Sequence, residues 1–445
     1  MRTHLAVAAA ITMFFFSIAT RGSPALPSRV LQTSSTFANF SCGGYDLCRA
    51  RTASVSRLGF HSREFFRRYI SRIPSSQSHF LGRISTSARR TAPLACSGEG
   101  NDDGTPATIA ISPLLFPLDL GPGEILPIAT SFLDSHGVTE PFLSSSHLLT
   151  YALGLAPNTF SRLSSRENAD MTLSEDQREI FVSHLSRRSL HEPLQYILGS
   201  WDFMDFEIKC RAPTLCPRPE TEELVEKVLV RMIPEEAEWN VLDVGCGTGC
   251  IGLAIARHRP RAKVVGIDVS SEAVKLSNDN AAKVLVGKGC GKYVAVRASA
   301  REFGRKTCHL PEITGIFGKD WDARFDIVVA NPPYIPSNVV DGLGRDVIDY
   351  EDRGALDGGA TGLDVIAEIF SAIPMWTAKE KGCDLFMEVD TSHPKLLERM
   401  FAETNFDYTS MPVTFPKTFL KDLIFMEGML DFSGKDRFVW LRCEP

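Results

Sequence analysis

Residues 241–268, VLDVGCGTGCIGLAIARHRPRAKVVGID, contain the pattern that decides the fold. A short apolar run over 241–244 leads directly into three glycines spaced as G-x-G-x-G, and an apolar helical face follows over 250–257. A second apolar run, 263–267, comes next and is followed at once by Asp268. Strand, glycine turn, helix and strand in this order predict a βαβ unit with parallel strands.

The glycine loop and Asp268 together predict a site for a nucleoside cofactor. Glycine lets the backbone turn sharply and lets a ligand approach closely, and a carboxylate at the end of the next strand can accept hydrogen bonds from both ribose hydroxyls. The spacing differs from the dinucleotide G-x-G-x-x-G, which makes an NAD-dependent enzyme or a ligand-free turn the weaker alternatives. The arrangement resembles the S-adenosylmethionine site of class I methyltransferases. This resemblance implies cofactor contacts from Gly245, Cys246, Gly247, Thr248, Gly249 and Asp268.

Strands and helices continue to alternate beyond this unit. Residues 325–330 are almost purely apolar, 364–373 have a helical pattern, and 383–389 form another apolar run. The alternation predicts an α/β fold with an open, doubly wound, mostly parallel sheet and ligands at the carboxyl ends of its strands. The resemblance implies the seven-stranded sheet of class I methyltransferases.

The strand over 325–330 ends in Asn331-Pro332-Pro333-Tyr334. Two prolines stiffen the main chain and remove two backbone donors, while Asn331 offers both an acceptor and a donor. A planar nitrogen nucleophile suits this segment, because its N–H groups can bond to the Asn331 side chain and the Pro332 carbonyl while the Tyr334 ring packs alongside. We therefore expect Asn331, Pro332 and Tyr334 to be catalytic, all four residues to bind substrate, and Asn331 also to reach the cofactor. N-P-P-Y occurs in methyltransferases acting on adenine amines and on glutamine amides, so it does not separate the two.

Other segments separate them. EPLQYILG at 192–199, PRPETE at 217–222, ALDGG at 355–359, GLD at 362–364 and SGKDRF at 433–438 resemble signatures of the HemK/PrmC family, in that order along the chain. The resemblance covers about 118–445 and implies methylation of the glutamine in the Gly-Gly-Gln motif of a peptide-chain release factor. The alternatives are an adenine-N6 methyltransferase acting on DNA or RNA, and a glutamine methyltransferase acting on a ribosomal protein. A scaffold without activity is a third reading, which the intact glycine loop, Asp268 and Asn331 oppose.

The chain departs from the family pattern in several places. Glu351 is followed by Asp352 where the family has proline, and Glu388 is followed by valine where the family has glycine. Residues 298–319 and about 414–428 resemble insertions. Aligning residues 320–321 with the family's acid–aromatic pair makes Trp321 the expected contact on the adenine side, although Ser299 is the alternative at that strand end.

The N-terminal third has a different composition. Residues 1–95 contain thirteen Arg, no Lys and two acids, a net charge of +11, so that 96–445 carry −17 of the total −6. An apolar start followed by an Arg/Ser-rich, acid-poor stretch resembles a bipartite leader, a signal peptide plus a transit peptide, which predicts a plastid. A mitochondrial presequence and the signal anchor of a secretory enzyme are the alternatives. We expect a linker at 96–117, a helical substrate-recognition domain at 118–199 with a capping box at Ser174 and Gln177, a hairpin linker at 200–216, and the methyltransferase domain at 217–445.

Charge and cysteine usage limit the function further. An acidic body argues against a general nucleic-acid surface, and eleven scattered cysteines without C-x-x-C argue against a disulfide framework or a zinc site. We therefore expect a release factor as protein substrate, no metal, no direct nucleic-acid binding, no membrane association in the mature form, and a monomer.

Overall fold

The computed structural model describes residues 111, 116–156, 159, 171–287, 289–304, 307–403, 406, 415 and 422–445. All described residues belong to one compact unit, Gly100–Pro445. The leader expected at 1–95 lies outside them. None of the helices in the described part is long and apolar enough to cross a membrane.

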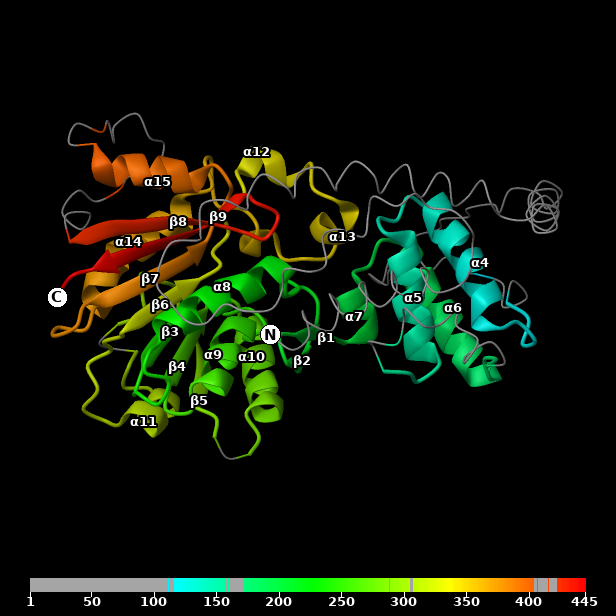
Figure 1. The fold of residues 1–445 in the computed structure, drawn as a ribbon, viewed down its shortest axis with the longest axis horizontal. Coiled ribbons are helices and arrows are strands. Elements are labelled where there is room, and N and C mark those ends of the chain that lie inside the picture. The colour runs from blue at the N-terminus through cyan, green and yellow to red at the C-terminus, as the bar shows by residue number, and fades with distance from the viewer. Residues whose placement is uncertain are drawn as a thin grey trace, which may run out of the picture. The chain divides into compact units, whose positions relative to one another are not determined.

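A seven-stranded sheet with the order β5-β4-β3-β6-β7-β9-β8 forms the centre of the fold (Figure 1). Strands β5 to β7 are mutually parallel, whereas β9 runs antiparallel to β7 and β8 antiparallel to β9. This confirms the predicted α/β fold with a mostly parallel sheet. The strands are β3 (Asn240–Val244), β4 (Lys263–Asp268), β5 (Lys292–Arg297), β6 (Ile327–Ala330), β7 (Cys383–Glu388), β8 (Leu423–Leu430) and β9 (Asp436–Cys443).

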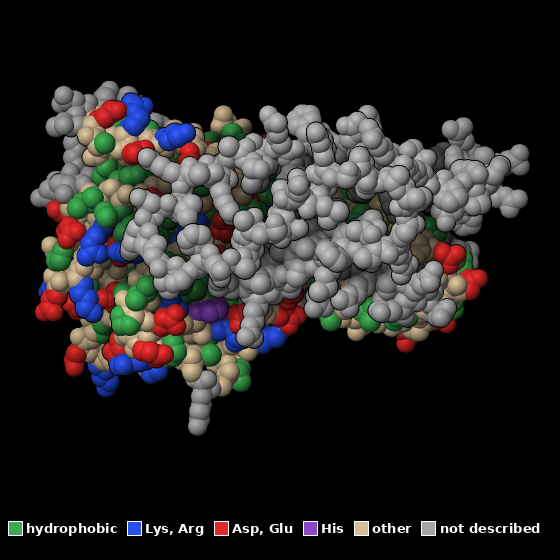
Figure 2. All heavy atoms as spheres, in the orientation of Figure 1, with side chains coloured by type: hydrophobic (Ala, Val, Ile, Leu, Met, Phe, Trp, Pro, Cys, Tyr) green, Lys and Arg blue, Asp and Glu red, His purple; other side chains and the backbone are tan. Residues whose placement is uncertain are grey.

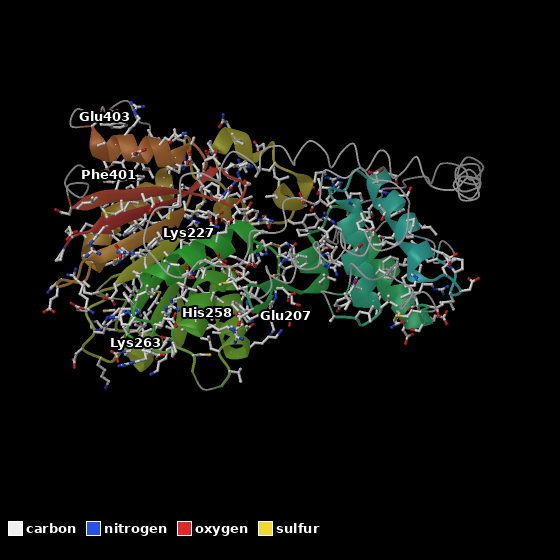
Figure 3. The ribbon with its side chains drawn as sticks, viewed as in Figure 1. Glu207, Lys227, His258, Lys263, Phe401 and Glu403 are labelled. Carbon is white, nitrogen blue, oxygen red and sulfur yellow. The ribbon has the colours of Figure 1, made fainter. Side chains whose placement is uncertain are left out.

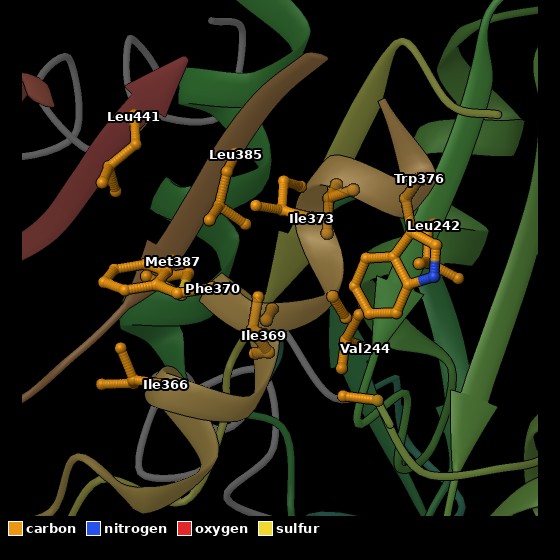
Figure 4. Close-up of a cluster of buried hydrophobic side chains, with 14 of the residues drawn as sticks. Leu242, Val244, Ile366, Ile369, Phe370, Ile373, Trp376, Leu385, Met387 and Leu441 are labelled. Carbon is orange, nitrogen blue, oxygen red and sulfur yellow. The ribbon is translucent and has the colours of Figure 1, made fainter. Parts of the chain in front are cut away.

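Helices cover both faces of the sheet because successive strand residues point to opposite sides. On one face, Leu242 and Val244 of β3 pack with Ile366 and Ile373 of the apolar helix α14 (Figure 4). On the other face, Val241 belongs to a second buried cluster. Helices α11 (Pro311–Phe317), α14 (Asp364–Trp376) and α15 (His393–Ala402) supply the first layer, and α8 (Pro219–Arg231), α9 (Cys250–His258) and α10 (Ser271–Val284) the second.

Short helices follow β6 in the segment before α14. They are α12 (Ser337–Val340), α13 (Arg345–Ile348) and the 3-10 turn Arg353–Ala355. They follow β6 and bring residues 335–357 back to its carboxyl end, where Ile335 bridges Asp357. Part of the expected insertion at 414–428 belongs to the sheet itself, because residues 423–428 lie in β8.

Four helices precede the sheet: α4 (Pro122–Ser135), α5 (Pro141–Ala152), α6 (Glu175–Ser189) and α7 (Leu194–Leu198). The capping box at Ser174 is confirmed, because its hydroxyl accepts from Gln177 N at 3.3 Å and Gln177 Oε1 accepts from Ser174 N at 3.0 Å. Phe116, placed at the end of the expected linker, is fully buried and packs edge-on against Phe181. These helices therefore have a core of their own.

The hairpin expected after the helices is present as β1 (Ser200–Phe203) and β2 (Phe206–Lys209), paired antiparallel. It is tied to the sheet domain through α10. Asn280 accepts from Lys209 N at 2.9 Å, and Lys283 donates to Glu207 at 2.6 Å (Glu207 is labelled in Figure 3). The segment after β2 is thereby held against the sheet, and it contributes to the cavity described next.

Candidate active site

A cavity of about 1210 Å³, counting its solvent-open mouth, lies at the carboxyl ends of the parallel strands. Strand β3 is followed by β4 on one side, and β6 lies on its other side, so the chain changes direction in the sheet at this point. Such a switch point opens a crevice in doubly wound sheets. The lining includes Thr214–Arg218, Thr221, Val244–Thr248, Asp268–Ser270, Ala298–Ala300, Asn331, Pro333, Asp352, Val365 and Glu368.

The glycine loop has the backbone that its sequence predicts. Gly245, Gly247 and Gly249 have φ values of 72°, 53° and 85°, in the left-handed region that favours glycine. At Gly249 a Cβ would also lie 2.4 Å from Ser277 Oγ, so helix α9 can start only with glycine there. The loop lines the cavity, and the positive end of the α9 dipole points toward it.

Asp268 lies at the end of β4 beside this loop. Its Oδ2 accepts from Gly247 N at 3.0 Å and its Oδ1 from Ser270 N at 2.9 Å. Burial raises the pKa of Asp268, and these two hydrogen bonds offset part of that effect. The carboxylate is only partly covered, and each oxygen keeps a further lone pair for a ligand. Its position and chemistry fit the ribose hydroxyls of a nucleoside cofactor.

The expected adenine-side contact at Trp321 is not supported by the structure. The indole stacks on Phe317 at 3.9 Å between ring centroids and meets Phe325 edge-on at 5.1 Å, away from the cavity lining. Ser299, the alternative, lines the cavity just after β5, together with Ala298. The chain leaves β5 in a turn capped by Ser299, so the strand end and not the D-W pair borders the cofactor cavity.

Asn331 follows β6 and lines the same cavity. Its Nδ2 donates to Glu388 Oε2 at 3.1 Å and to Thr221 Oγ1 at 3.2 Å. Because the amide nitrogen is held by these partners, the carbonyl oxygen Oδ1 is left as the free acceptor. Among the described residues, none donates a hydrogen bond to that oxygen.

Glu388 joins three segments at the end of β7. Besides Asn331, its carboxylate accepts from Thr221 Oγ1 at 2.9 Å and from the Tyr334 hydroxyl at 3.1 Å. The side chain is almost fully buried, and burial raises its pKa although the hydrogen bonds from Thr221 and Tyr334 act in the opposite direction. The hydroxyl of Tyr334 therefore anchors its ring to the end of β7.

The two prolines between them occupy different environments. Pro333 lines the cavity, whereas Pro332 is buried. No hydrogen bond to the Pro332 carbonyl oxygen is found in the described part of the chain. Two acceptors, this oxygen and Asn331 Oδ1, are thus available in the segment that ends β6.

A second buried acid fixes the other wall of the cavity. Glu351, whose side chain is fully buried, accepts from Arg218 at 2.7 and 2.9 Å and from Cys216 N at 3.1 Å. Asp352, the residue that replaces the family's proline, lines the cavity and donates its backbone N–H to Pro213 O. The P-R-P-E-T-E segment is therefore held at both ends, by Glu351 through Arg218 and by Glu388 through Thr221.

Sequence reasoning missed Glu388, Thr221 and the Arg218–Glu351 pair as parts of the site. The sequence did contain a pattern that could have identified Glu388, because it is an acid at the end of a buried strand, as Asp268 is. Asp243, at the end of β3, supports the start of α9, since its Oδ2 accepts from Gly252 N at 2.9 Å. Among the described residues, no group of three His, Cys, Asp or Glu side chains converges to hold a metal ion.

Comparison with known proteins agrees with this geometry. Residues 124–199 match the PrmC N-terminal domain family, and residues 224–301 match the methyltransferase small domain family. The human MTRF1L release factor glutamine methyltransferase is 30% identical over 325 residues, 72% of this chain and 86% of that protein. The release factor glutamine methyltransferase of Geobacter sulfurreducens is 33% identical over 287 residues, 64% of this chain and 89% of that protein. This chain belongs to the HemK/PrmC family of release factor glutamine methyltransferases.

Proposed function

We propose that this chain transfers a methyl group from S-adenosylmethionine to the side-chain amide nitrogen of the glutamine in the Gly-Gly-Gln motif of a peptide-chain release factor. The observation that carries the proposal is the orientation of Asn331: a buried carboxylate holds its nitrogen and leaves its oxygen as an acceptor at the cavity. A primary amide has two N–H donors, and Asn331 Oδ1 and the Pro332 carbonyl are two acceptors for them.

The cofactor would lie between the glycine loop and Asp268, with its adenine toward Ala298 and Ser299. When bound, S-adenosylmethionine supplies an electrophilic methyl group on its sulfonium. Gly245 and Gly247 keep the loop free of side chains, so that the backbone can approach the cofactor closely. Asp268 accepts hydrogen bonds from the ribose, and Val365 of α14 closes the apolar side of the adenine pocket.

Catalysis then depends on alignment. An amide nitrogen is a weak nucleophile because its lone pair is delocalised into the carbonyl. Hydrogen bonds from its N–H groups to Asn331 Oδ1 and Pro332 O hold the nitrogen in line with the methyl group and stabilise the positive charge that develops on it. Glu388 acts through Asn331, because it fixes the direction of the amide. The proton is lost to water after transfer, so no general base is required.

The rival activities fit less well. An adenine-N6 methyltransferase acting on nucleic acid needs a basic surface, and residues 96–445 carry −17. In the part of the face that Figure 2 leaves uncovered, acidic and basic side chains are interspersed. A ribosomal protein remains the alternative protein substrate, and the test below includes it.

The test is single-turnover methyl transfer at saturating S-adenosylmethionine to a release factor, a ribosomal protein, a free Gly-Gly-Gln peptide and nucleic acid. We expect transfer to the release factor, and we expect Asn331→Ala to retain less than about a tenth of the rate, a loss of more than about 1.4 kcal/mol in the barrier. Asn338→Ala, at an exposed asparagine of α12, is the matched control and should leave the rate within about twofold. Transfer to nucleic acid alone, or a rate retained by Asn331→Ala, would refute the proposal.

The remaining expectations extend this proposal. Residues 1–95 would be removed after directing the chain to a plastid, or alternatively to a mitochondrion, where bacterial-type release factors act. The helices at 118–199 would recognise the release factor, and the mature chain would act as a monomer. Imaging of the full-length chain with a C-terminal fluorescent tag tests the location: a cytosolic signal would contradict the organellar assignment, and a mitochondrial signal would contradict the plastid.

A further inference from the structure

The turn between β8 and β9 presents an exposed aromatic ring at the catalytic edge of the sheet. Strand β8 runs antiparallel to β9, which runs antiparallel to β7, so β8 and β7 end at the same edge. Phe432 follows β8 directly and is 76% exposed, the largest fraction for a big apolar side chain in the described part of the chain. Leu430, two residues earlier, is also exposed. Isolated exposed apolar residues are common, so the surroundings of this ring decide its meaning.

The turn is rigidly held. Asp431 is buried and its Oδ1 accepts from Ser433 N, Ser433 Oγ and Lys435 N at 2.7–3.0 Å. Its Oδ2 accepts from Arg437 Nε at 3.0 Å. Burial alone would raise the pKa of Asp431, but these hydrogen bonds outweigh it and hold the pKa below its usual range. The backbone that carries the ring is thus ordered by hydrogen bonds within the turn itself.

The turn is also connected to the catalytic residues. Phe432 N donates to Glu223 Oε1 at 3.3 Å, and Glu223 lies two residues after Thr221 in α8 (Figure 1 shows the turn between β8 and β9 beside the start of α8). On the other side, Arg437 O accepts from the backbone N–H of Val389, the residue after Glu388. The turn is therefore tied to α8 and to the end of β7, the two elements whose residues Thr221 and Glu388 hold Asn331.

We propose that Phe432 is a docking residue for the domain of the release factor that bears the methylated glutamine. This inference rests on the proposed function. A glutamine within a folded protein must bring its neighbouring surface to this edge of the sheet in order to reach Asn331. An aromatic side chain on such an ordered turn has few rotatable bonds to immobilise on binding and buries a large apolar area, which is the usual character of an interface hot spot. The ring contacts an apolar patch beside the glutamine loop, and a short free peptide lacks that patch.

The test compares kinetics on an intact release factor and on a free Gly-Gly-Gln peptide, with the full chain as enzyme. Phe432→Ala should raise KM for the factor about tenfold with little change in kcat, so that the ratio of kcat/KM on the factor to that on the peptide falls by about the same amount. Phe432→Tyr should restore most of this ratio. Val286→Ala, at a similarly exposed apolar residue that precedes β5 at the opposite edge, is the control and should leave the ratio unchanged.

Three outcomes would overturn the inference. An unchanged ratio in Phe432→Ala would show that the ring does not contact the factor. An equal loss on factor and peptide would make the turn a support for the pocket and not a docking surface. If the unaltered chain fails to methylate the factor, the proposed function itself fails, and that result is seen before any variant is compared.

Discussion

Replacement of Glu388 by glutamine separates orientation of the site from stability of the fold. Glutamine has nearly the same shape as glutamate. Its carbonyl oxygen can accept from Thr221 and Asn331 in place of Oε2, and its NH2 can face the Tyr334 hydroxyl in place of Oε1. The variant therefore keeps the packing and removes the charge.

The expected loss of rate follows from the bond to Asn331. A hydrogen bond to a charged group contributes about 1.5–3 kcal/mol and a neutral one about 0.5–1.5 kcal/mol. Neutralising Glu388 thus weakens the hold on the Asn331 nitrogen by about 1–1.5 kcal/mol. If all of that is expressed in the transition state, kcat falls about five- to fifteenfold. The free energy of unfolding should rise at neutral pH, because the variant no longer buries a charge.

The pH dependence gives the sign of both effects. Burial raises the pKa of Glu388 in the folded chain, so the folded state binds this proton more tightly than the unfolded state. Stability from this group is present at low pH and is lost as pH rises from the unfolded pKa, about 4.3, through the folded pKa. The glutamine variant should lack this loss, and its rate should lack the rise that the native chain shows over the same pH interval.

The assay is single-turnover transfer to the release factor at saturating cofactor from pH 5 to 8, with urea unfolding over the same range. A folded Glu388→Gln chain with at least half of the native rate at pH 8 would refute the orienting role of the carboxylate. A Glu388→Gln chain that is less stable at neutral pH would refute the assignment of a net burial penalty to the charge.

Three further changes test other parts of the site. Asp268→Ala should weaken cofactor binding by about 1.5–3 kcal/mol, roughly 10- to 150-fold in Kd by calorimetry, and unchanged affinity in a folded chain would exclude the ribose contact. Trp321→Ala should lower Tm by several degrees yet keep the cofactor Kd within about twofold, whereas a tenfold rise in Kd would restore Trp321 to the adenine pocket. Arg218→Met leaves Glu351 buried without its cation and should lower the free energy of unfolding by about 2–4 kcal/mol, toward the smaller values because Arg218 is partly exposed. Adding Glu351→Gln to that variant should recover much of the loss in urea unfolding, and failure to do so would place the loss elsewhere.

The central part of the fold was predictable because local patterns specify it. The glycine loop, Asp268 and Asn331 each follow directly from an apolar run, so their places at the carboxyl edge were predictable once the strands were parallel. The capping box at Ser174 was predictable for the same reason, since both partners lie within one turn. Beside them, the apolar run at 383–389 predicted β7.

The parts that could not be predicted depend on contacts between distant segments. Glu388 meets Thr221 and Asn331, which lie 167 and 57 residues away, and no local pattern shows that pairing. Trp321 was expected at the adenine side because residues 320–321 form an acid–aromatic pair; its indole stacks on Phe317 and it is not among the residues that line the cavity, so this contact stays a prediction. Two adjacent residues such as 320–321 do not show by themselves which strand end they lie beside.

The buried acids of this site orient its hydrogen-bond donors. Burial raises the pKa of Glu351, Glu388 and Asp243, the last to about 7, and each of them accepts a hydrogen bond that fixes one wall of the pocket or the helix behind it. Burying a carboxylate costs folding free energy, and this cost is offset only when its oxygens accept hydrogen bonds or pair with a cation. Here they are used to hold donors: Glu388 holds the amide nitrogen of Asn331, which leaves Asn331 Oδ1 as an acceptor at the cavity. An amide is a weak nucleophile, and a protein can help it without first removing a proton by holding its nitrogen in a fixed orientation. The oriented acceptors at the carboxyl edge of this sheet suit that role.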